Sequence, residues 1–129
     1  MFKLLKSLPA LPGQVEIKMQ VAPGVTESQH VLLLFRQLPE QEHVELVKQI
    51  EAGGVYDLDI AEKVVCGWVD VGDEDGKPVE FTPENFAALL AIPGASAPIV
   101  RQYFELRSGR AEEKNSQKSA DTSPAPAAA

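Results

Sequence analysis

Apolar and polar residues alternate strictly at the start of the chain, over 15–21 (Val-Glu-Ile-Lys-Met-Gln-Val), which is the pattern of a half-buried strand. A turn signal, Ala22-Pro23-Gly24, follows it. The apolar run from His30 to Leu38 then predicts a second strand, antiparallel to the first. Thr26-Glu27-Ser28-Gln29 has the spacing of a capping box, so a helix over the same run is the alternative.

From Pro39 onward the apolar spacing becomes helical, and it predicts about four helices. The first ends at Gly53-Gly54, where two glycines stop it. The second begins at Asp57 or Asp59 and ends near Gly67-Trp68, before a dense turn signal over 71–78 and a short strand over 79–81. The third starts at Thr82-Pro83-Glu84 and closes at Pro93-Gly94, and the fourth starts at Ser96.

These elements predict an α+β fold that is mainly helical, with an N-terminal strand pair, about four helices and a disordered C-terminal tail. Residues 1–14 are expected to form an N-terminal arm, because prolines and a glycine interrupt them. Residues 15–112 are expected to form a single globular domain. Residues 113–129 contain no apolar side chain larger than alanine or proline, and a segment of that composition is expected to be disordered.

Charge is distributed unevenly along the chain, whose net charge is −7. The segment 40–84 holds thirteen acidic residues against three lysines, while the remainder has an excess of bases. Nucleic acid is therefore not expected as a partner, because phosphate contacts need clustered Lys and Arg. A solvated acidic surface and a binding face for a basic partner both fit this pattern.

A lone cysteine and the absence of long apolar runs point to the cytoplasm. Cys66 has no internal partner for a disulfide, which favours a reducing compartment. The N-terminal apolar stretch is interrupted by Lys6 and Pro9, unlike a signal peptide, and no run approaches the roughly 18 apolar residues that span a bilayer. A membrane partner is not expected. For so small a domain, a homo-oligomer is an open alternative to a monomer.

Candidate chemistry is sparse, so we expect no enzyme, no cofactor and no metal. Asp73-Glu74-Asp75-Gly76 fails as a calcium loop, because Val71 and Thr82 would occupy carboxylate positions. His30 and His43 are the only histidines, and no pair has zinc-site spacing. Ser96 follows a helix-ending Pro-Gly, which indicates a helix cap and not a nucleophile.

Three aromatic residues are the candidate partner contacts: Trp68, Tyr103 and Phe104. Trp68 precedes the acidic turn, and its size favours a core anchor over an exposed contact. The last helix carries Ile99, Val100, Tyr103, Phe104 and Leu106, more than one narrow stripe requires. Part of that breadth fits a partner face, although a well-buried helix gives the same pattern.

Several motifs occur in a characteristic order between residues 64 and 115. They are Gly67-Trp68-Val69-Asp70-Val71, the acidic turn Asp73-Glu74-Asp75-Gly76, the helix start Phe81-Thr82-Pro83-Glu84-Asn85-Phe86, the pair Leu89-Leu90, Ile92-Pro93-Gly94, Tyr103-Phe104 and Lys114-Asn115. This order resembles the tail assembly chaperones of long-tailed bacteriophages. A looser match, of a strand followed by the Phe35-Arg36 run and a helix, covers 15–63.

The resemblance implies a function that the residues alone do not predict. Such chaperones bind the tape measure protein, keep its hydrophobic helices soluble and help recruit subunits of the major tail tube protein. They act in the host cell cytoplasm and are absent from the mature virion. The alternative is a structural or adaptor subunit that is retained in the phage tail.

Overall fold

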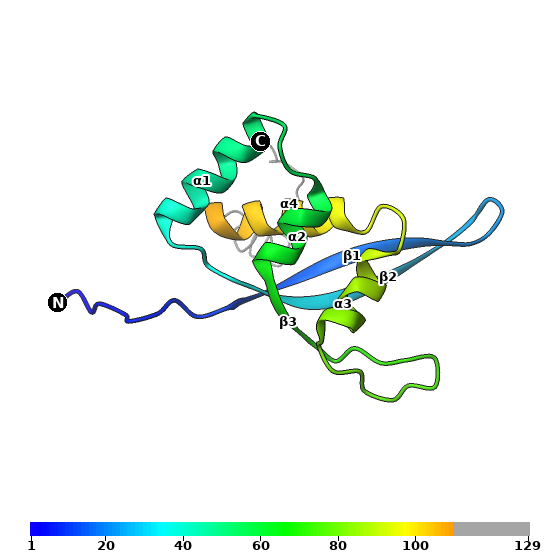
Figure 1. The fold of residues 1–129 in the computed structure, drawn as a ribbon. Helices are drawn as coiled ribbons and strands as arrows, with labels where there is room; N and C mark the ends of the chain where they lie inside the picture. The colour runs from blue at the N-terminus through cyan, green and yellow to red at the C-terminus, as the bar shows by residue number, and fades with distance from the viewer. Residues whose placement is uncertain (110–129) are drawn as a thin grey trace, which may run out of the picture.

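The computed structural model describes residues 1–109, which form three antiparallel strands and four helices (Figure 1). In chain order these elements are β1 (Leu11–Ala22), β2 (Val25–Phe35), α1 (Glu40–Glu51), α2 (Asp57–Val64), β3 (Val65–Val69), α3 (Pro83–Leu90) and α4 (Ser96–Ser108). No helix within 1–109 combines the length and the apolar composition required to cross a membrane.

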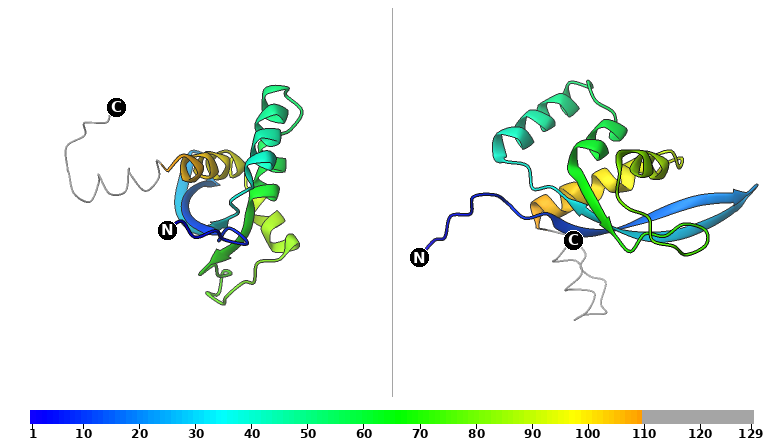
Figure 2. Two further views of the ribbon diagram at one scale, coloured as in Figure 1. Left: turned by 90° about the vertical axis from the view of Figure 1, so that its left-hand side faces the viewer. Right: turned by 60° about the horizontal axis from the view of Figure 1, so that its bottom comes forward.

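A long β-hairpin dominates the sheet, whose strand order is β1-β2-β3. The alternation in β1 turns Val15 and Ile17 into the core, and Val15 lies opposite Val31 of β2. Every residue from 20 to 30 is exposed, so the far half of the hairpin projects beyond the body (Figures 1 and 2). Thr26 to Gln29 lie within β2, and the alternative helix does not form.

The core lies between the sheet and the helices. Helix α4 packs on β1 and on α2. This close approach depends on Gly13, since a Cβ at that position would lie 2.9 Å from side-chain atoms of Gln102, Leu106 and Phe35. The largest fully buried side chains are Tyr103, Phe35, Leu33, Ile99 and Val64. No polar or charged residue among 1–109 is fully buried.

The segment 65–69 forms a strand, although the sequence predicts the end of a helix there. α2 ends at Val64, and β3 begins at the next residue. β3 pairs with β2, with Trp68 opposite Leu33. The predicted strand at 79–81 does not form; an isolated bridge joins Gly72 and Pro78 instead.

The prediction of a mainly helical fold is wrong. Of the described residues, 1–109, 38% are helical and 28% are strand, which makes this an α+β fold with a substantial sheet. The excess strand comes from the unpredicted β3, from β1, which begins at Leu11 within the segment expected to be an arm, and from β2, which begins at Val25, before the predicted start at His30. The predicted strand pair and the four helices are present. The predicted disordered tail, 113–129, lies outside the described residues.

Candidate functional site

An open groove of about 680 Å³ lies between the β-hairpin and α3. We call it the hairpin–α3 groove. Its apolar lining residues are Ile17, Met19, Val31, Trp68, Val71, Val79, Ala88, Leu89 and Ile92, and its polar ones include Gln29, His30, Asp70, Asp73, Glu74 and Asn85. Most of the large apolar side chains here are only partly buried, so the groove offers apolar surface to a partner.

The first wall is the core-facing side of the hairpin. In β1, alternate residues face the same side of the sheet, so Ile17 and Met19 follow each other along this wall. Ile17 is 3% exposed, whereas Met19 is only partly buried. The apolar surface thus continues outward from the core along the projecting ribbon.

Trp68 and the loop 70–79 form the second wall. The Trp68 indole Nε1 donates a hydrogen bond to the Val79 carbonyl oxygen at 2.9 Å, which ties the far end of the loop to β3. Within the loop, the Val79 amide donates to the Val71 carbonyl at 2.8 Å. One carboxylate oxygen of Asp73 accepts from the amides of Asp75 and Lys77, both at 2.9 Å. These bonds give the loop a defined shape.

The third wall is α3, whose start is fixed by side-chain capping. The Thr82 hydroxyl accepts from the Asn85 amide at 3.1 Å, and Pro83 occupies the first turn. The Asn85 side chain in turn donates to the Glu80 carbonyl at 2.8 Å. Phe86 and Leu90 are buried beneath the helix, which leaves Ala88 and Leu89 in the groove.

The groove has negative charge on one side only. Asp70, Asp73 and Glu74, which we call the acidic wall, line it, and none of its lining residues, all within the described chain, is a lysine or arginine. Asp70 also adopts a left-handed backbone conformation, with φ of 60°, where β3 ends and the loop begins. The site therefore suits an apolar segment that carries positive charge along one edge.

A second cavity of about 500 Å³ lies between β1 and α4. Its lining mixes Glu16 and Glu105 with Lys18 and Arg101, and little large apolar surface is present. This cavity therefore lacks both features of the hairpin–α3 groove, an apolar floor and charge of a single sign. The hairpin–α3 groove is the better candidate for partner binding.

The three predicted contact residues do not lie together. Trp68 lies in the hairpin–α3 groove, partly buried, with its ring edge-on to Phe81 at a centroid distance of 5.1 Å. Tyr103 is only 2% exposed, and Phe104 is partly buried beside it. In this conformation Tyr103 belongs to the core and is not accessible to a partner.

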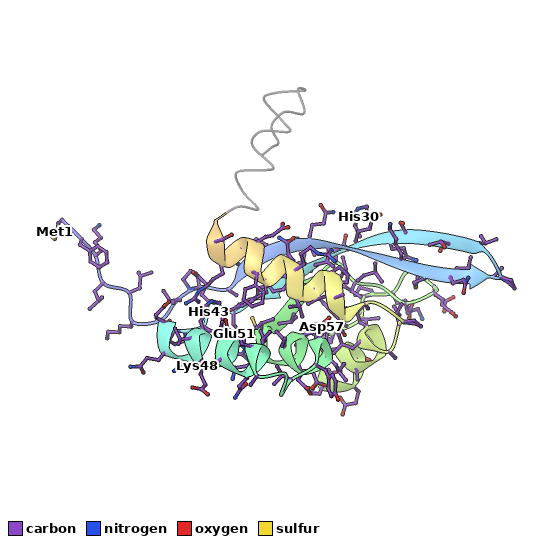
Figure 3. The ribbon with its side chains drawn as sticks, turned by 90° about the horizontal axis from the view of Figure 1, so that it is seen from above. Met1, His30, His43, Lys48, Glu51 and Asp57 are labelled. Carbon is purple, nitrogen blue, oxygen red and sulfur yellow. The ribbon has the colours of Figure 1, made fainter. Side chains whose placement is uncertain are left out.

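Tyr103 instead holds α1 against α4. The His43 Nδ1 and the Tyr103 hydroxyl are 2.8 Å apart, and Figure 3 shows His43 between the two helices. Arg107 donates to the Leu38 carbonyl and forms an ion pair of 3.0 Å with Glu40. Burial, together with the positive charge of Arg107, lowers the pKa of His43, and burial raises the pKa of Tyr103.

The histidines and the cysteine do not gather into a metal site. No group of three or more His, Cys, Asp or Glu side chains within residues 1–109 has a geometry that holds a metal ion. Cys66 is partly buried, with its Sγ 3.5 Å from the Leu34 carbonyl oxygen. Ser96 is the first residue of α4.

Comparison with known proteins returns no match to a family model, a curated protein or a solved structure. The groove is therefore interpreted from its own chemistry. Of the apolar residues that line the groove, the sequence singled out Trp68 as a candidate contact but did not single out Met19, Leu89 or Ile92. Met19 carried a usable signal, because the alternation in β1 continues past the residues that a small core needs.

Proposed function

We propose that this chain is a phage tail assembly chaperone that binds the tape measure protein in the host cytoplasm, keeps it soluble and helps recruit tail tube subunits. One observation carries the proposal. Five of the motifs that resemble the chaperone family contribute residues to the hairpin–α3 groove: Trp68 and Asp70 from the first, Asp73 and Glu74 from the acidic turn, Asn85 and Leu89 from the start and the leucine pair of the third helix, and Ile92 from Ile92-Pro93-Gly94. Tyr103-Phe104 does not line the groove, and Lys114-Asn115 lies outside the described residues.

The chemistry of the groove supports the same function. A tape measure protein exposes long apolar helical segments before assembly, and an escort must cover them without precipitating itself. The groove supplies the apolar cover, and the net charge of −7 supplies solubility. Many weak contacts made by several copies along one extended client would add up through avidity.

Ala88 offers a direct test of the groove. Ala88 and its neighbour Ala87 are both exposed on α3, but only Ala88 lines the groove. Ala88→Arg should block the groove without disturbing the core, and Ala87→Arg is the matched control. Co-expression with the tape measure protein of the same phage, followed by a pull-down, should give a soluble complex with the wild type and with Ala87→Arg. Ala88→Arg should lose most of that complex.

Two further measurements separate this function from its rivals. Raising the salt concentration from about 0.1 to about 0.5 M should weaken the complex little, because apolar contacts dominate and only the acidic wall is screened. Mass spectrometry of purified particles should find no stoichiometric copy of this protein. If the pull-down recovers no tape measure protein, and the mature tail contains stoichiometric copies of this protein, both results would contradict the chaperone function and favour a structural or adaptor subunit.

A further inference from the structure

Because β1 begins at Leu11, the N-terminal arm of the folded protein comprises residues 1–10, and it exposes an unusual amount of apolar surface. Phe2 and Leu4 are each 86% exposed, Leu5 is 61% exposed and Leu8 is 50% exposed. Lys3 and Lys6 alternate with them, and the arm contains no acidic residue. A basic, apolar segment of this kind is the counterpart of an apolar surface with acidic edges.

The arm is directed away from the rest of its own chain. The Gln37 side-chain amide donates to the Pro9 carbonyl at 2.9 Å, which fixes the root of the arm beside the loop that leaves β2. Beyond this point the arm continues outward, at the opposite end of the molecule from the hairpin tip (Figures 1 and 2). Figure 3 shows Met1 far from His30, which lines the hairpin–α3 groove.

We infer that the N-terminal arm of one copy docks in the hairpin–α3 groove of a second copy. The apolar side chains of the arm match the apolar floor of the groove, and Lys3 and Lys6 match the acidic wall, which has no basic residue of its own. An arm of ten residues spans at most about 33–36 Å when extended, which is long enough to line a groove of this size. To reach the groove of its own copy, the arm would have to reverse direction at Pro9, where the hydrogen bond from Gln37 holds it in its present direction.

An arm-in-groove contact is heterologous, because it joins two different surfaces of the same protein. Such contacts leave one free arm and one free groove at the ends of a chain, so oligomers lengthen with concentration unless a ring closes. The contact is also small, which predicts weak association of the transient class. The inference does not rest on the proposed function, but it uses the same groove, so a client and an arm would compete.

The experiment compares self-association of the full chain with that of two disabling variants. Leu4→Ser/Leu5→Ser removes the apolar side chains of the arm, and Ala88→Arg blocks the groove. Sedimentation velocity from about 10 µM to about 1 mM should show weight-average mass rising for the wild type and for the Ala87→Arg control. Each disabling variant should weaken association by about 10-fold or more. Circular dichroism melting curves should be unchanged, since all of these positions are exposed.

Mixing the two variants gives the decisive result. Ala88→Arg retains an intact arm, and Leu4→Ser/Leu5→Ser retains an intact groove, so an equimolar mixture should form one-to-one dimers and no longer species. Trp68, the only tryptophan, lies in the groove, and its emission should shift on mixing.

Three outcomes would overturn the inference. They are a wild type that stays monomeric up to about 1 mM, variants that associate as the wild type does, and a mixture that stays monomeric. In the first case, binding of the arm to anionic vesicles would identify a membrane surface as its partner instead. Client binding is tested separately: Leu4→Ser/Leu5→Ser should still capture the tape measure protein, so loss of self-association and loss of the chaperone function are distinguishable.

Discussion

Trp68 joins three parts of the structure, and its removal should weaken the fold and the groove together. Its indole Nε1 bonds to the Val79 carbonyl at 2.9 Å. Its ring lies edge-on to Phe81 and to Phe86, at centroid distances of 5.1 and 6.4 Å. The residue itself is on β3, so it connects the sheet, the loop and α3. We expect Trp68→Ala to destabilise the protein strongly.

The magnitude follows from burial and from the hydrogen bond. A fully buried aromatic side chain covers about 150–250 Å², worth about 4–6 kcal/mol at about 25 cal/mol/Å². Trp68 keeps part of its surface exposed, and unfolded chains already bury some of theirs, so the expected loss for Trp68→Ala is about 3 kcal/mol. Trp68→Phe keeps most of the apolar contact and loses the hydrogen bond, which should cost about 1–2 kcal/mol.

Urea denaturation followed by far-ultraviolet circular dichroism measures both losses, because fluorescence disappears with the only tryptophan. Phe2→Ala is the control, since Phe2 is 86% exposed and its loss should cost less than about 0.5 kcal/mol. A Trp68→Ala variant as stable as Phe2→Ala would refute the reasoning. A variant that kept its stability but lost the tape measure protein would identify Trp68 as a contact alone.

Thermal denaturation tests three further positions. Gly13→Ala should cost about 1–3 kcal/mol, because its methyl group would meet three side-chain atoms at 2.9 Å. Gly54→Ala should be nearly neutral, because its methyl group would make only an ordinary contact, 3.8 Å from the Gln49 carbonyl oxygen. Equal effects would contradict the close packing of α4 on β1. Thr82→Ala should cost about 1 kcal/mol by removing the cap of α3, and an unchanged midpoint would exclude that cap. The pKa of His43 is lower in the folded protein than in the unfolded chain, so stability should fall as the pH drops below about 6.5. His43→Gln should flatten this pH dependence. Identical pH profiles for the two proteins would contradict a lowered pKa of His43.

The hairpin and the helices were predictable because their signals are local. Strict alternation over 15–21 defines a strand face, and Thr82-Pro83 defines a helix start whatever the rest of the chain does. β3 carried no such signal. It follows α2 without a loop, its apolar run is too short to distinguish strand from helix, and its partner β2 lies far away in sequence.

The candidate site was predictable only in part. The order of the motifs from Gly67 to Leu90 indicated that these residues act together. It did not indicate that the β-hairpin would face them across a groove, because that arrangement depends on tertiary packing. Tyr103 illustrates the same point, because a helix that is apolar on more than one side does not reveal which side is covered. The side of α4 that carries Tyr103 is covered because Tyr103 hydrogen-bonds to His43, which is 60 residues away in the sequence.

The walls of the groove differ in how firmly they are held, and this difference bears on the kind of partner the groove fits. α3 is anchored by Phe86 and Leu90 in the core, whereas the hairpin beyond Met19 is a two-stranded ribbon with every residue exposed. A two-stranded ribbon without packing is only marginally stable, so the outer end of the hairpin wall, at Met19, yields at lower energetic cost than its base, where Ile17 is 3% exposed. A groove that is rigid at its base and yielding at one end accommodates apolar segments of differing width. The shape of the groove then discriminates only weakly between partner segments. The acidic wall provides the main discrimination, because it favours positively charged segments over equally apolar neutral ones.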